Sequence, residues 1–253
     1  MQLHLSTWPE IEAYLATSKA ILIPIGSTEQ HGPNGLLGTD ALCPEIIGRR
    51  AGDEAGILVA PTFIVGQAQH HMAFPGTITL RPSTMIATMI DWAQSLARHG
   101  FEKLYWLNGH GGNIATITAA FSEIYHGVTF DKAGRKPGGN EGAPLRCVLR
   151  NWWELPGVMD ICRQLFPVGE GSHATPSEVS VTWFAYPEAA KQVAMNPRIA
   201  PTGPILDADD YRRRFPDGRI GSDPSQASVE AGEKIVAAAV KAVIAEFKQF
   251  AES

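Results

Sequence analysis

The sequence predicts an α/β fold, in which short buried strands alternate with amphipathic helices. Apolar runs at residues 21–25 and 103–107 both stop at glycine-rich loops, which is typical of buried strands that end in shaped loops. Each loop leads into a segment whose apolar residues repeat at helical spacing. With 253 residues, the chain is long enough for one large α/β domain or two small ones.

The composition is that of an ordinary soluble protein, with 44% hydrophobic and 19% charged residues. No apolar run approaches the ~20 residues that cross a bilayer, and the first ten residues lack the features of a signal peptide. We therefore expect a cytoplasmic location and no membrane contact. The net charge is −5, and aspartates flank the one basic cluster, residues 212–214, so nucleic-acid binding is not expected. Three widely spaced cysteines indicate reduced thiols.

The first half of the chain contains six elements that follow from apolar spacing and from helix start signals. They are helix 8–17, strand 21–25, helix 41–51, helix 83–99, strand 103–107 and helix 114–125. Pro9 stands at the start of the first helix, where proline is favoured. Asp40 and Ser83 occupy positions where an N-cap is expected for the second and third helices.

The second half continues the same alternation. The spacing predicts a strand-like segment at 145–153 and helices at 158–166, 179–186 and 228–250. Pro176 and Glu178 precede the second of these helices, in positions that suit a first turn. Residues 127–144 and 196–227 are rich in glycine and proline, so we expect a long surface excursion and a mostly irregular loop.

The loop after the first strand carries Glu29, His31 and Asp40 among glycines. Residues two apart in extended chain point the same way, so Glu29 and His31 can aim at one point. Two carboxylates and an imidazole on one loop are ligands that suit zinc, manganese or iron. The competing interpretation is a solvated loop in which Asp40 only caps the following helix.

The second strand ends in another glycine-rich turn, residues 108–113, which carries His110. This turn lacks both the Gly-x-Gly-x-x-Gly spacing and the Lys-Ser/Thr ending of phosphate-binding loops. In an open parallel sheet, ligands bind beyond the carboxyl ends of the strands. We therefore expect His110 to meet the loop that holds Glu29 and His31.

Two later loops carry further candidates. Residues 66–80 hold His70 and His71 and form a candidate rim of the site, while residues 169–178 hold His173 and Glu178. Glu178 would equally serve to complement the helix dipole, and His173 would equally be an ordinary loop histidine.

Five stretches of the chain match one known pattern in order and approximate spacing. They are Gly26–Pro33 with Thr39-Asp40, Phe74–Thr77, Asn108–Asn113, His173-Ala174 with Glu178–Ser180, and Gly221–Ala227. Together they resemble the creatininase family of metal-dependent amidohydrolases. The resemblance implies that residues 1–253 form a single three-layer α/β/α domain with a mainly parallel central sheet. It also implies a two-metal centre at the strand ends and a homo-oligomer, typically a hexamer.

The resemblance also implies roles for individual residues. Glu29 and His110 would hold one metal ion and His31 the other, with Asp40 bridging the two. Glu178 would complete the second metal and serve catalysis. His173 would face the substrate and move a proton as a catalytic residue.

The chain departs from creatininase where that enzyme binds creatinine. Gly111 and Gly112 replace a Tyr-Glu pair, Ala68 replaces a serine, and Gly169-Glu170 replaces a Trp-Asp pair. We expect the substrate to contact His71, Gly111, Glu170 and His173. Creatinine itself is not the expected substrate, because the pocket differs while the metal ligands are kept.

The expected function is hydrolysis of a C–N amide bond, other than a peptide bond, in a small molecule. A cyclic creatinine-like amide or a formamide would be attacked by water activated by two divalent ions. Zinc or manganese, or both, are expected, with iron as a further option. The alternatives are a non-catalytic member of the family, a deformylase or peptidase, and least of all an enzyme that binds phosphate or a dinucleotide.

Overall fold

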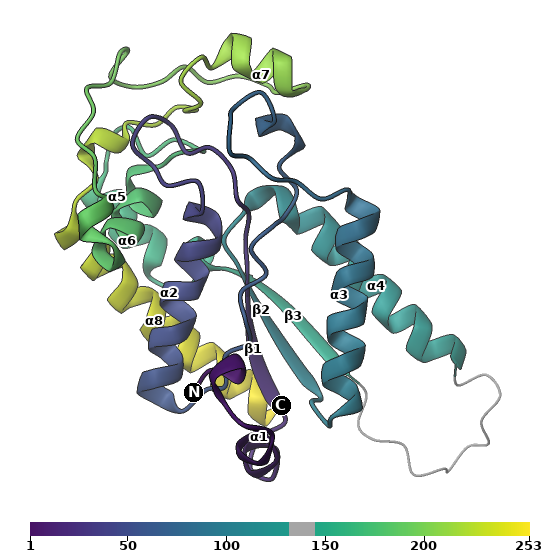
Figure 1. Ribbon diagram of the computed structural model, residues 1–253. Helices are drawn as coiled ribbons and strands as arrows, with labels where there is room; N and C mark the ends of the chain where they lie inside the picture. Colours follow the sequence, from purple (N-terminus) through teal and green to yellow (C-terminus); the bar gives the residue numbers. More distant parts are fainter. Residues whose placement is uncertain (132–144) are drawn as a thin grey trace.

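The computed structural model describes residues 1–131 and 145–253, in which helices cover both faces of a central sheet (Figure 1). The strands are β1 (Ala20–Ile25), β2 (Lys103–Asn108) and β3 (Arg146–Asn151). The helices are α1 (Trp8–Leu15), α2 (Thr39–Ala55), α3 (Pro82–Arg98), α4 (Ile114–Asp131), α5 (Val158–Leu165), α6 (Pro176–Ala185), α7 (Ala208–Arg214) and α8 (Val229–Glu252). The three-layer α/β/α fold predicted from the sequence is confirmed.

All strand pairs in the described sheet are parallel, in the order β1-β2-β3. Ile25 pairs with Asn108, and Asn108 pairs with Asn151, so the strands end at the same level. The Asn108 side chain donates to Asn151 Oδ1 at 2.9 Å, which ties the last two ends together. The loops that follow β1 and β2 therefore start from neighbouring points on one edge.

The alternation of side chains along β1 divides the hydrophobic core in two. Leu22 belongs to a cluster with side chains of α2, α5, α6 and α8, whereas Ile21 and Ile23 belong to a cluster with α3 and α4. Successive strand side chains face opposite sides of a sheet, and each fully buried aliphatic side chain contributes about 1.5–3 kcal/mol. Packing on both faces makes β1 a rigid base for the polar loop that follows it.

The helix after this loop begins two residues earlier than predicted, and Asp40 is not its N-cap. Gly38 occupies the cap position of α2, and no side-chain cap hydrogen bond is present there. Asp40 lies inside the first turn, so its carboxylate is not engaged by the helix amides and turns toward the strand ends. The Ser83 cap is also wrong: α3 begins at Pro82 after Arg81, because the fixed φ of proline suits the first helical position.

Two loop predictions need correction. Residues 127–131 continue helix α4, while the remainder of the predicted excursion, residues 132–144, lies outside the described residues. The loop predicted at 196–227 contains α7, which begins after an N-cap bond from the Asp210 amide to Asp207. All three cysteines are free, as predicted. Within the described part of the chain, no helix combines the length and apolar character of a membrane span.

Candidate metal centre

A cavity of about 470 Å³ opens at the carboxyl ends of the strands. Its inner wall includes Asp40, His110, His173 and Glu178, whereas Glu29 and His31 lie fully buried behind it. Its outer wall is mostly apolar and includes Trp152, Trp153, Met159, Ile205 and Ile220. The structure therefore brings the five predicted metal ligands together at the predicted edge of the sheet.

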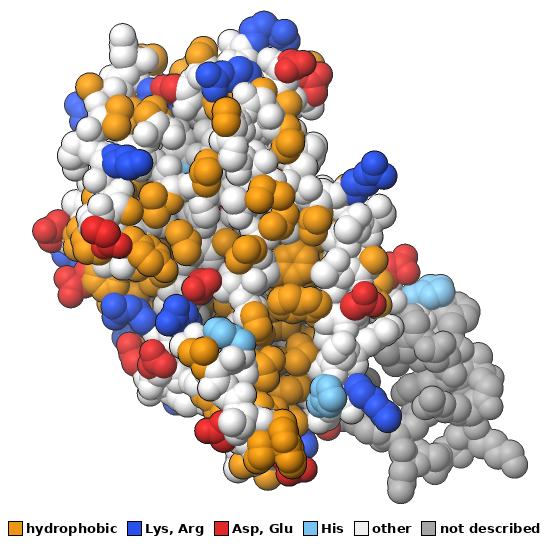
Figure 2. Space-filling view, viewed as in Figure 1, with side chains coloured by type: hydrophobic (Ala, Val, Ile, Leu, Met, Phe, Trp, Pro, Cys, Tyr) orange, Lys and Arg blue, Asp and Glu red, His pale blue; other side chains and the backbone are white. Residues whose placement is uncertain are grey.

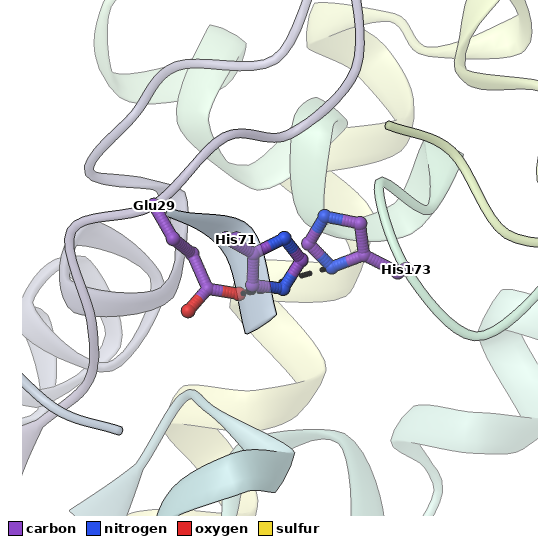
Figure 3. Close-up of side chains that lie close together, drawn as sticks. All are labelled: Glu29, His71 and His173. Atoms are coloured by element: carbon purple, nitrogen blue, oxygen red, sulfur yellow. Dashed lines mark ion pairs between the residues drawn. The ribbon is translucent and has the colours of Figure 1, made fainter. Parts of the chain in front are cut away.

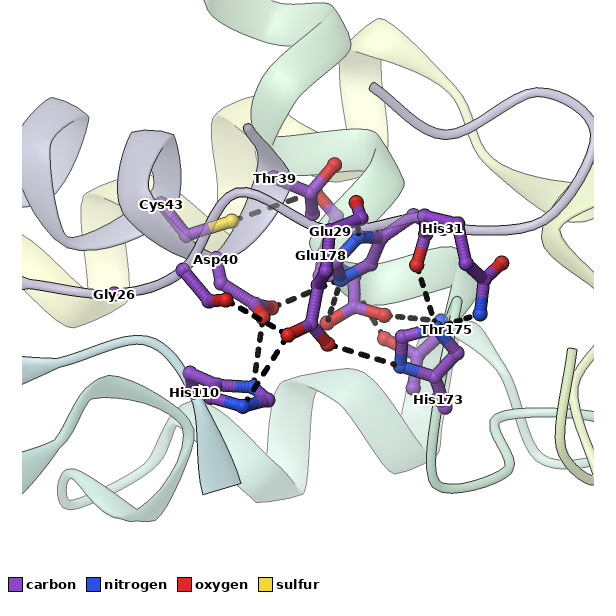
Figure 4. A network of polar contacts seen from close by, with 12 residues as sticks. Gly26, Glu29, His31, Thr39, Asp40, Cys43, His110, His173, Thr175 and Glu178 are labelled. Atoms are coloured by element: carbon purple, nitrogen blue, oxygen red, sulfur yellow. Dashed lines mark hydrogen bonds and ion pairs between the residues drawn. The ribbon is translucent and has the colours of Figure 1, made fainter. Parts of the chain in front are cut away.

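Asp40 contacts two histidines of this polar group (Figure 4). Its Oδ1 lies 2.9 Å from His31 Nε2, and its Oδ2 lies 2.8 Å from His110 Nδ1. Glu29 Oε2 is 3.3 Å from His110 Nε2, and Glu178 Oε2 is 4.0 Å from His31 Nε2. One carboxylate thus has an imidazole on each side, and a further carboxylate lies beside each imidazole.

Three histidines each bind a backbone carbonyl with one ring nitrogen, which leaves the other nitrogen facing the centre. His31 Nδ1 donates to Glu29 O at 3.0 Å, His110 Nε2 to Gln67 O at 2.8 Å, and His173 Nε2 to Gln30 O at 2.8 Å. Each ring therefore keeps its hydrogen outside and, when neutral, presents an unprotonated nitrogen to the centre. Carbonyl partners of this kind commonly orient histidines that ligate metals.

Two carboxylate oxygens in the centre are buried without a hydrogen-bond donor. They are Glu29 Oε1 and Asp40 Oδ2. Asp40 Oδ2 faces His110 Nδ1, which carries no hydrogen in the neutral ring because the hydrogen lies on Nε2. Asp40 Oδ2 and the unprotonated His110 Nδ1 are both buried acceptors, 2.8 Å apart, so a cation or a proton must lie between them. The donor set therefore fits a divalent metal bound by nitrogen and oxygen ligands.

The pKa shifts in the metal-free centre also indicate that its carboxylates need a positive partner. Burial lowers the pKa of His31, but Asp40 and the other carboxylates outweigh burial and raise it to about 10. Burial also lowers the pKa of His110, but Glu29 and Asp40 outweigh it and raise this pKa to about 9. Burial raises the pKa of Asp40, but His31 and His110 bring it well below its usual range. Without metal, protons must therefore compensate the buried carboxylates.

His173 has the opposite shift. Burial, with His31 and His71 nearby, holds the pKa of His173 well below its usual range. Its ring is neutral at pH 7, and its Nδ1 lies 3.9 Å from Glu29 Oε1. Ser222 Oγ donates to His173 O at 2.6 Å, and an isolated β-bridge joins His173 to Ile220. A remote loop thereby holds this histidine against the centre.

The predicted substrate contacts, His71, Gly111, Glu170 and His173, all line the cavity. Burial raises the pKa of Glu170 to about 7, and its Oε1 accepts a hydrogen bond from Ser177. A Cβ on Gly111 would meet no atom within 4 Å, so the cavity is open at this point.

His71 lies closer to Glu29 than the sequence indicates. His71 Nε2 is 3.0 Å from Glu29 Oε1 (Figure 3). With His173 these residues form a second set of donors whose ligand atoms lie within 4.8 Å of one another. The roles of Gln30 and of the Gln67 carbonyl were also missed. No local signal could have indicated them, since every residue has a carbonyl and the partners are distant in sequence.

Comparison with known proteins places these features in a family. Residues 4–247 match the family model described as "Creatininase: Creatinine amidohydrolase". Creatinine amidohydrolase of Pseudomonas putida is 28% identical over 254 residues, covering 94% of this chain and 92% of that protein. Mycofactocin precursor peptide peptidase of Mycobacterium ulcerans (strain Agy99) is 32% identical over 128 residues, or 47% of each chain.

Solved structures agree with the sequence relatives. A mutant creatininase of "Zn-Zn type" and a "Creatininase Mn" structure each superpose with a TM-score of 0.81 at 26% identity. Both comparisons cover 98% of this chain and 98% of the other. The fold is therefore shared over nearly the whole length of the chain.

Proposed function

The chain belongs to the creatininase family of hydrolases, and on that basis we propose that it hydrolyses a C–N amide bond in a small molecule. The observation that carries the proposal is the buried donor set. Two buried carboxylate oxygens accept no hydrogen bond, and three imidazoles, when neutral, present an unprotonated nitrogen to the centre. A cyclic amide or a formamide is the proposed substrate class, and creatinine is not the first choice.

We propose two divalent ions per chain, zinc or manganese, with iron as a further option. Glu29 and His110 would hold one ion, His31 and Glu178 the other, and Asp40 both. When bound, the ions supply Lewis acidity toward the substrate carbonyl and lower the pKa of a shared water. The two orphan oxygens and the inward nitrogens of His31 and His110 support this assignment.

His173 is the proposed proton carrier. Its Nε2 hydrogen is held by Gln30 O, so only Nδ1 can take up or release a proton. Its lowered pKa keeps the free ring neutral, so the Nδ1 lone pair is unprotonated before the reaction. His173 then returns the proton to the leaving nitrogen, which allows the C–N bond to break. No covalent intermediate with the protein is needed.

The lining of the cavity narrows the choice of substrate. Among its described residues there is no lysine or arginine, and phosphate groups are usually bound by such side chains. This disfavours the phosphate- or dinucleotide-binding alternative. Similarity to a peptide peptidase over 47% of the chain favours peptide-bond hydrolysis as the second candidate function. A non-catalytic role is less favoured, because buried carboxylates without metal are costly.

The deciding experiment combines metal analysis with a substrate panel. We expect about two zinc or manganese ions per chain in protein purified without chelator, and turnover of at least one lactam, cyclic ureide, formamide or peptide. Removal of the metal should stop turnover, and its return should restore it. Well under one ion per chain would refute the two-metal centre. Full metal content with no turnover on the whole panel would instead favour a non-catalytic member.

Zinc affinity should increase with pH. His31 and His110, with pKa values of about 10 and about 9 in the metal-free centre, carry protons at neutral pH. Zinc binds the neutral ring, so binding must release these protons. We expect the affinity to gain roughly one to two factors of ten per pH unit between about pH 7 and pH 9.

Calorimetric titrations in buffers of different ionisation enthalpy count the released protons. Zinc binding at neutral pH without proton release would contradict the expectation. The same raised pKa values stabilise the folded metal-free chain fully below about pH 6.5. This contribution is lost as the pH rises through about 9 to about 10.

A homo-oligomer, a hexamer by family resemblance, and a cytoplasmic location complete the proposal. Large hydrophobic side chains gather on one face of the molecule (Figure 2). Leu5 is 72% exposed, Trp8 76%, Ile64 53% and Ile78 54%. Exposed apolar side chains in such number favour an interface. Sedimentation at several concentrations would measure the assembly, and a monomer throughout would refute it.

A further inference from the structure

The side-chain amide of Gln30 lies next to the centre with its two ends fixed. Its Oε1 accepts from the Gly32 amide at 2.9 Å, and its Nε2 donates to Gly218 O at 2.9 Å. These backbone partners have opposite polarity, so the oxygen and nitrogen cannot be exchanged. A Cβ on Gly218 would lie 1.8 Å from Oε1, and φ there is +85°. Only glycine permits this close approach.

The second hydrogen on Gln30 Nε2 faces two possible acceptors, His71 Nδ1 and the more distant Tyr211 hydroxyl. His173 Nε2 is 2.9 Å away, but its own hydrogen is donated to Gln30 O, so it cannot accept. The Tyr211 hydroxyl is farther, at 3.2 Å, and donates to Gly218 O. The remaining neighbour is His71 Nδ1 at 2.9 Å. A hydrogen on His71 Nδ1 would point at an amide nitrogen that carries only hydrogens, so Nδ1 is unprotonated and the hydrogen of the neutral ring lies on Nε2.

We propose that Gln30 is a positioning residue that fixes the hydrogen of His71 on Nε2, the nitrogen beside Glu29, and so excludes His71 as a metal ligand. His71 is 1% exposed, and its Nε2 lies 3.0 Å from Glu29 Oε1. Ser27 Oγ donates to the other oxygen, Oε2, at 2.8 Å. Ser27 therefore holds one oxygen of Glu29, while the His71 N–H lies beside the other, which accepts no hydrogen bond.

In this tautomer, with the hydrogen on Nε2, His71 differs from the other histidines of the site in its hydrogen-bond partner. His31, His110 and His173 each have a carbonyl on the outer nitrogen, whereas His71 has an amide donor there. An ion held by Glu29, His71 and His173 would need an unprotonated His71 Nε2. The hydrogen would then move to Nδ1, directly against the Gln30 amide hydrogen. The second donor set is therefore not a metal site, although its atoms lie close together.

The nitrogen resonances of the histidine rings test the proposal, which rests on the proposed metal centre. In zinc-loaded protein with ¹⁵N-labelled histidine, His71 should show a protonated Nε2, an unprotonated Nδ1 and no zinc-bound nitrogen. His31 Nε2 and His110 Nδ1 should show zinc-bound shifts. A zinc-bound nitrogen or a hydrogen on Nδ1 of His71 in the native protein would overturn the proposal.

A matched pair of variants separates positioning from general packing. Gln30→Glu keeps the shape but replaces the donor by an acceptor, so the His71 Nδ1 resonance should shift into the protonated range. Gln67→Glu is the control, since Gln67 Nε2 also donates to a backbone carbonyl, Leu80 O at 2.7 Å, and is also buried. The Gln67 side chain touches no imidazole among the described contacts, so His71 should keep its native pattern. An unshifted His71 in folded Gln30→Glu would overturn the proposal.

Failure of this inference can be distinguished from failure of the metal centre. If the protein binds no zinc, the proposed function fails, yet the hydrogen on His71 can still be located in the metal-free protein. If zinc binds and His71 ligates it, only the positioning role fails. The native spectrum alone decides between these results, so a variant that does not fold leaves the test intact.

Discussion

Asp40→Asn should abolish metal-dependent turnover, with kcat/KM reduced by at least about 10³-fold. Mutation of a residue that only supports a metal ligand typically lowers metal affinity or activity 10–100-fold. Asp40 contacts both His31 and His110 and is itself a proposed ligand, so a larger loss is expected. Asparagine keeps the shape but removes the charge and one of the two acceptor oxygens. The two proposed ions would then lose the shared ligand that compensates their repulsion. Metal content and turnover of the same preparation measure the effect.

Asp209→Asn is the matched control. Asp209 is also an aspartate in the first turn of a helix, but it is exposed on α7 and far in sequence from the centre. This variant should keep full metal content and activity. If Asp40→Asn retains activity, Asp40 serves only the structure of α2 and the two-metal arrangement is wrong. A matching loss in Asp209→Asn would show that the assay reports general damage.

Gly112→Ala should lower metal affinity by 10–100-fold and turnover by about 10²-fold. A Cβ at this position would lie 2.4 Å from His110 Nε2 and 2.9 Å from Gln67 O. These are the two atoms of the hydrogen bond that fixes the orientation of His110. One methyl group would therefore separate them and turn the ligand nitrogen away from Asp40. Zinc titration and steady-state kinetics measure the two losses.

The neighbouring glycine provides the comparison. A Cβ on Gly111 would meet nothing within 4 Å, so Gly111→Ala should bind zinc normally. Its effect should fall on KM, because Gly111 lines the cavity and an added methyl narrows it. Equal zinc affinity in Gly112→Ala and native protein would mean that the His110–Gln67 bond has no part in metal binding.

The local pattern of the chain predicted most of the fold. Apolar runs and glycine loops identified β1 and β2, and helical spacing identified α3 and α8, because burial of one face imposes these periods. The boundary errors arose where two start signals competed. A glycine cap and an early threonine moved the start of α2, while a proline moved that of α3. The short polar helix α7 was missed because seven residues are too few for a clear period.

Candidate ligands could also be found from sequence, since their residue types and their positions after strands indicate metal chemistry. Glu29, His31 and His110 follow β1 and β2, and the parallel register of these strands makes their ends adjacent. Because ligands of open parallel sheets bind beyond the carboxyl ends of the strands, the sequence predicted that these residues lie together even though the strand register was unknown. That residues 1–253 form one domain, and which ion each ligand holds, stay predictions.

The sequence by itself determined the kinds of donor and the edge of the sheet at which they meet. Only the tertiary structure decided which nitrogen of each histidine faces the centre. The partner of His31 is two residues away, but that of His110 is 43 residues away and that of His173 is 143. A neutral imidazole places its hydrogen on whichever nitrogen meets an acceptor. That acceptor is a backbone carbonyl, which every residue carries, so only the folded chain can select it.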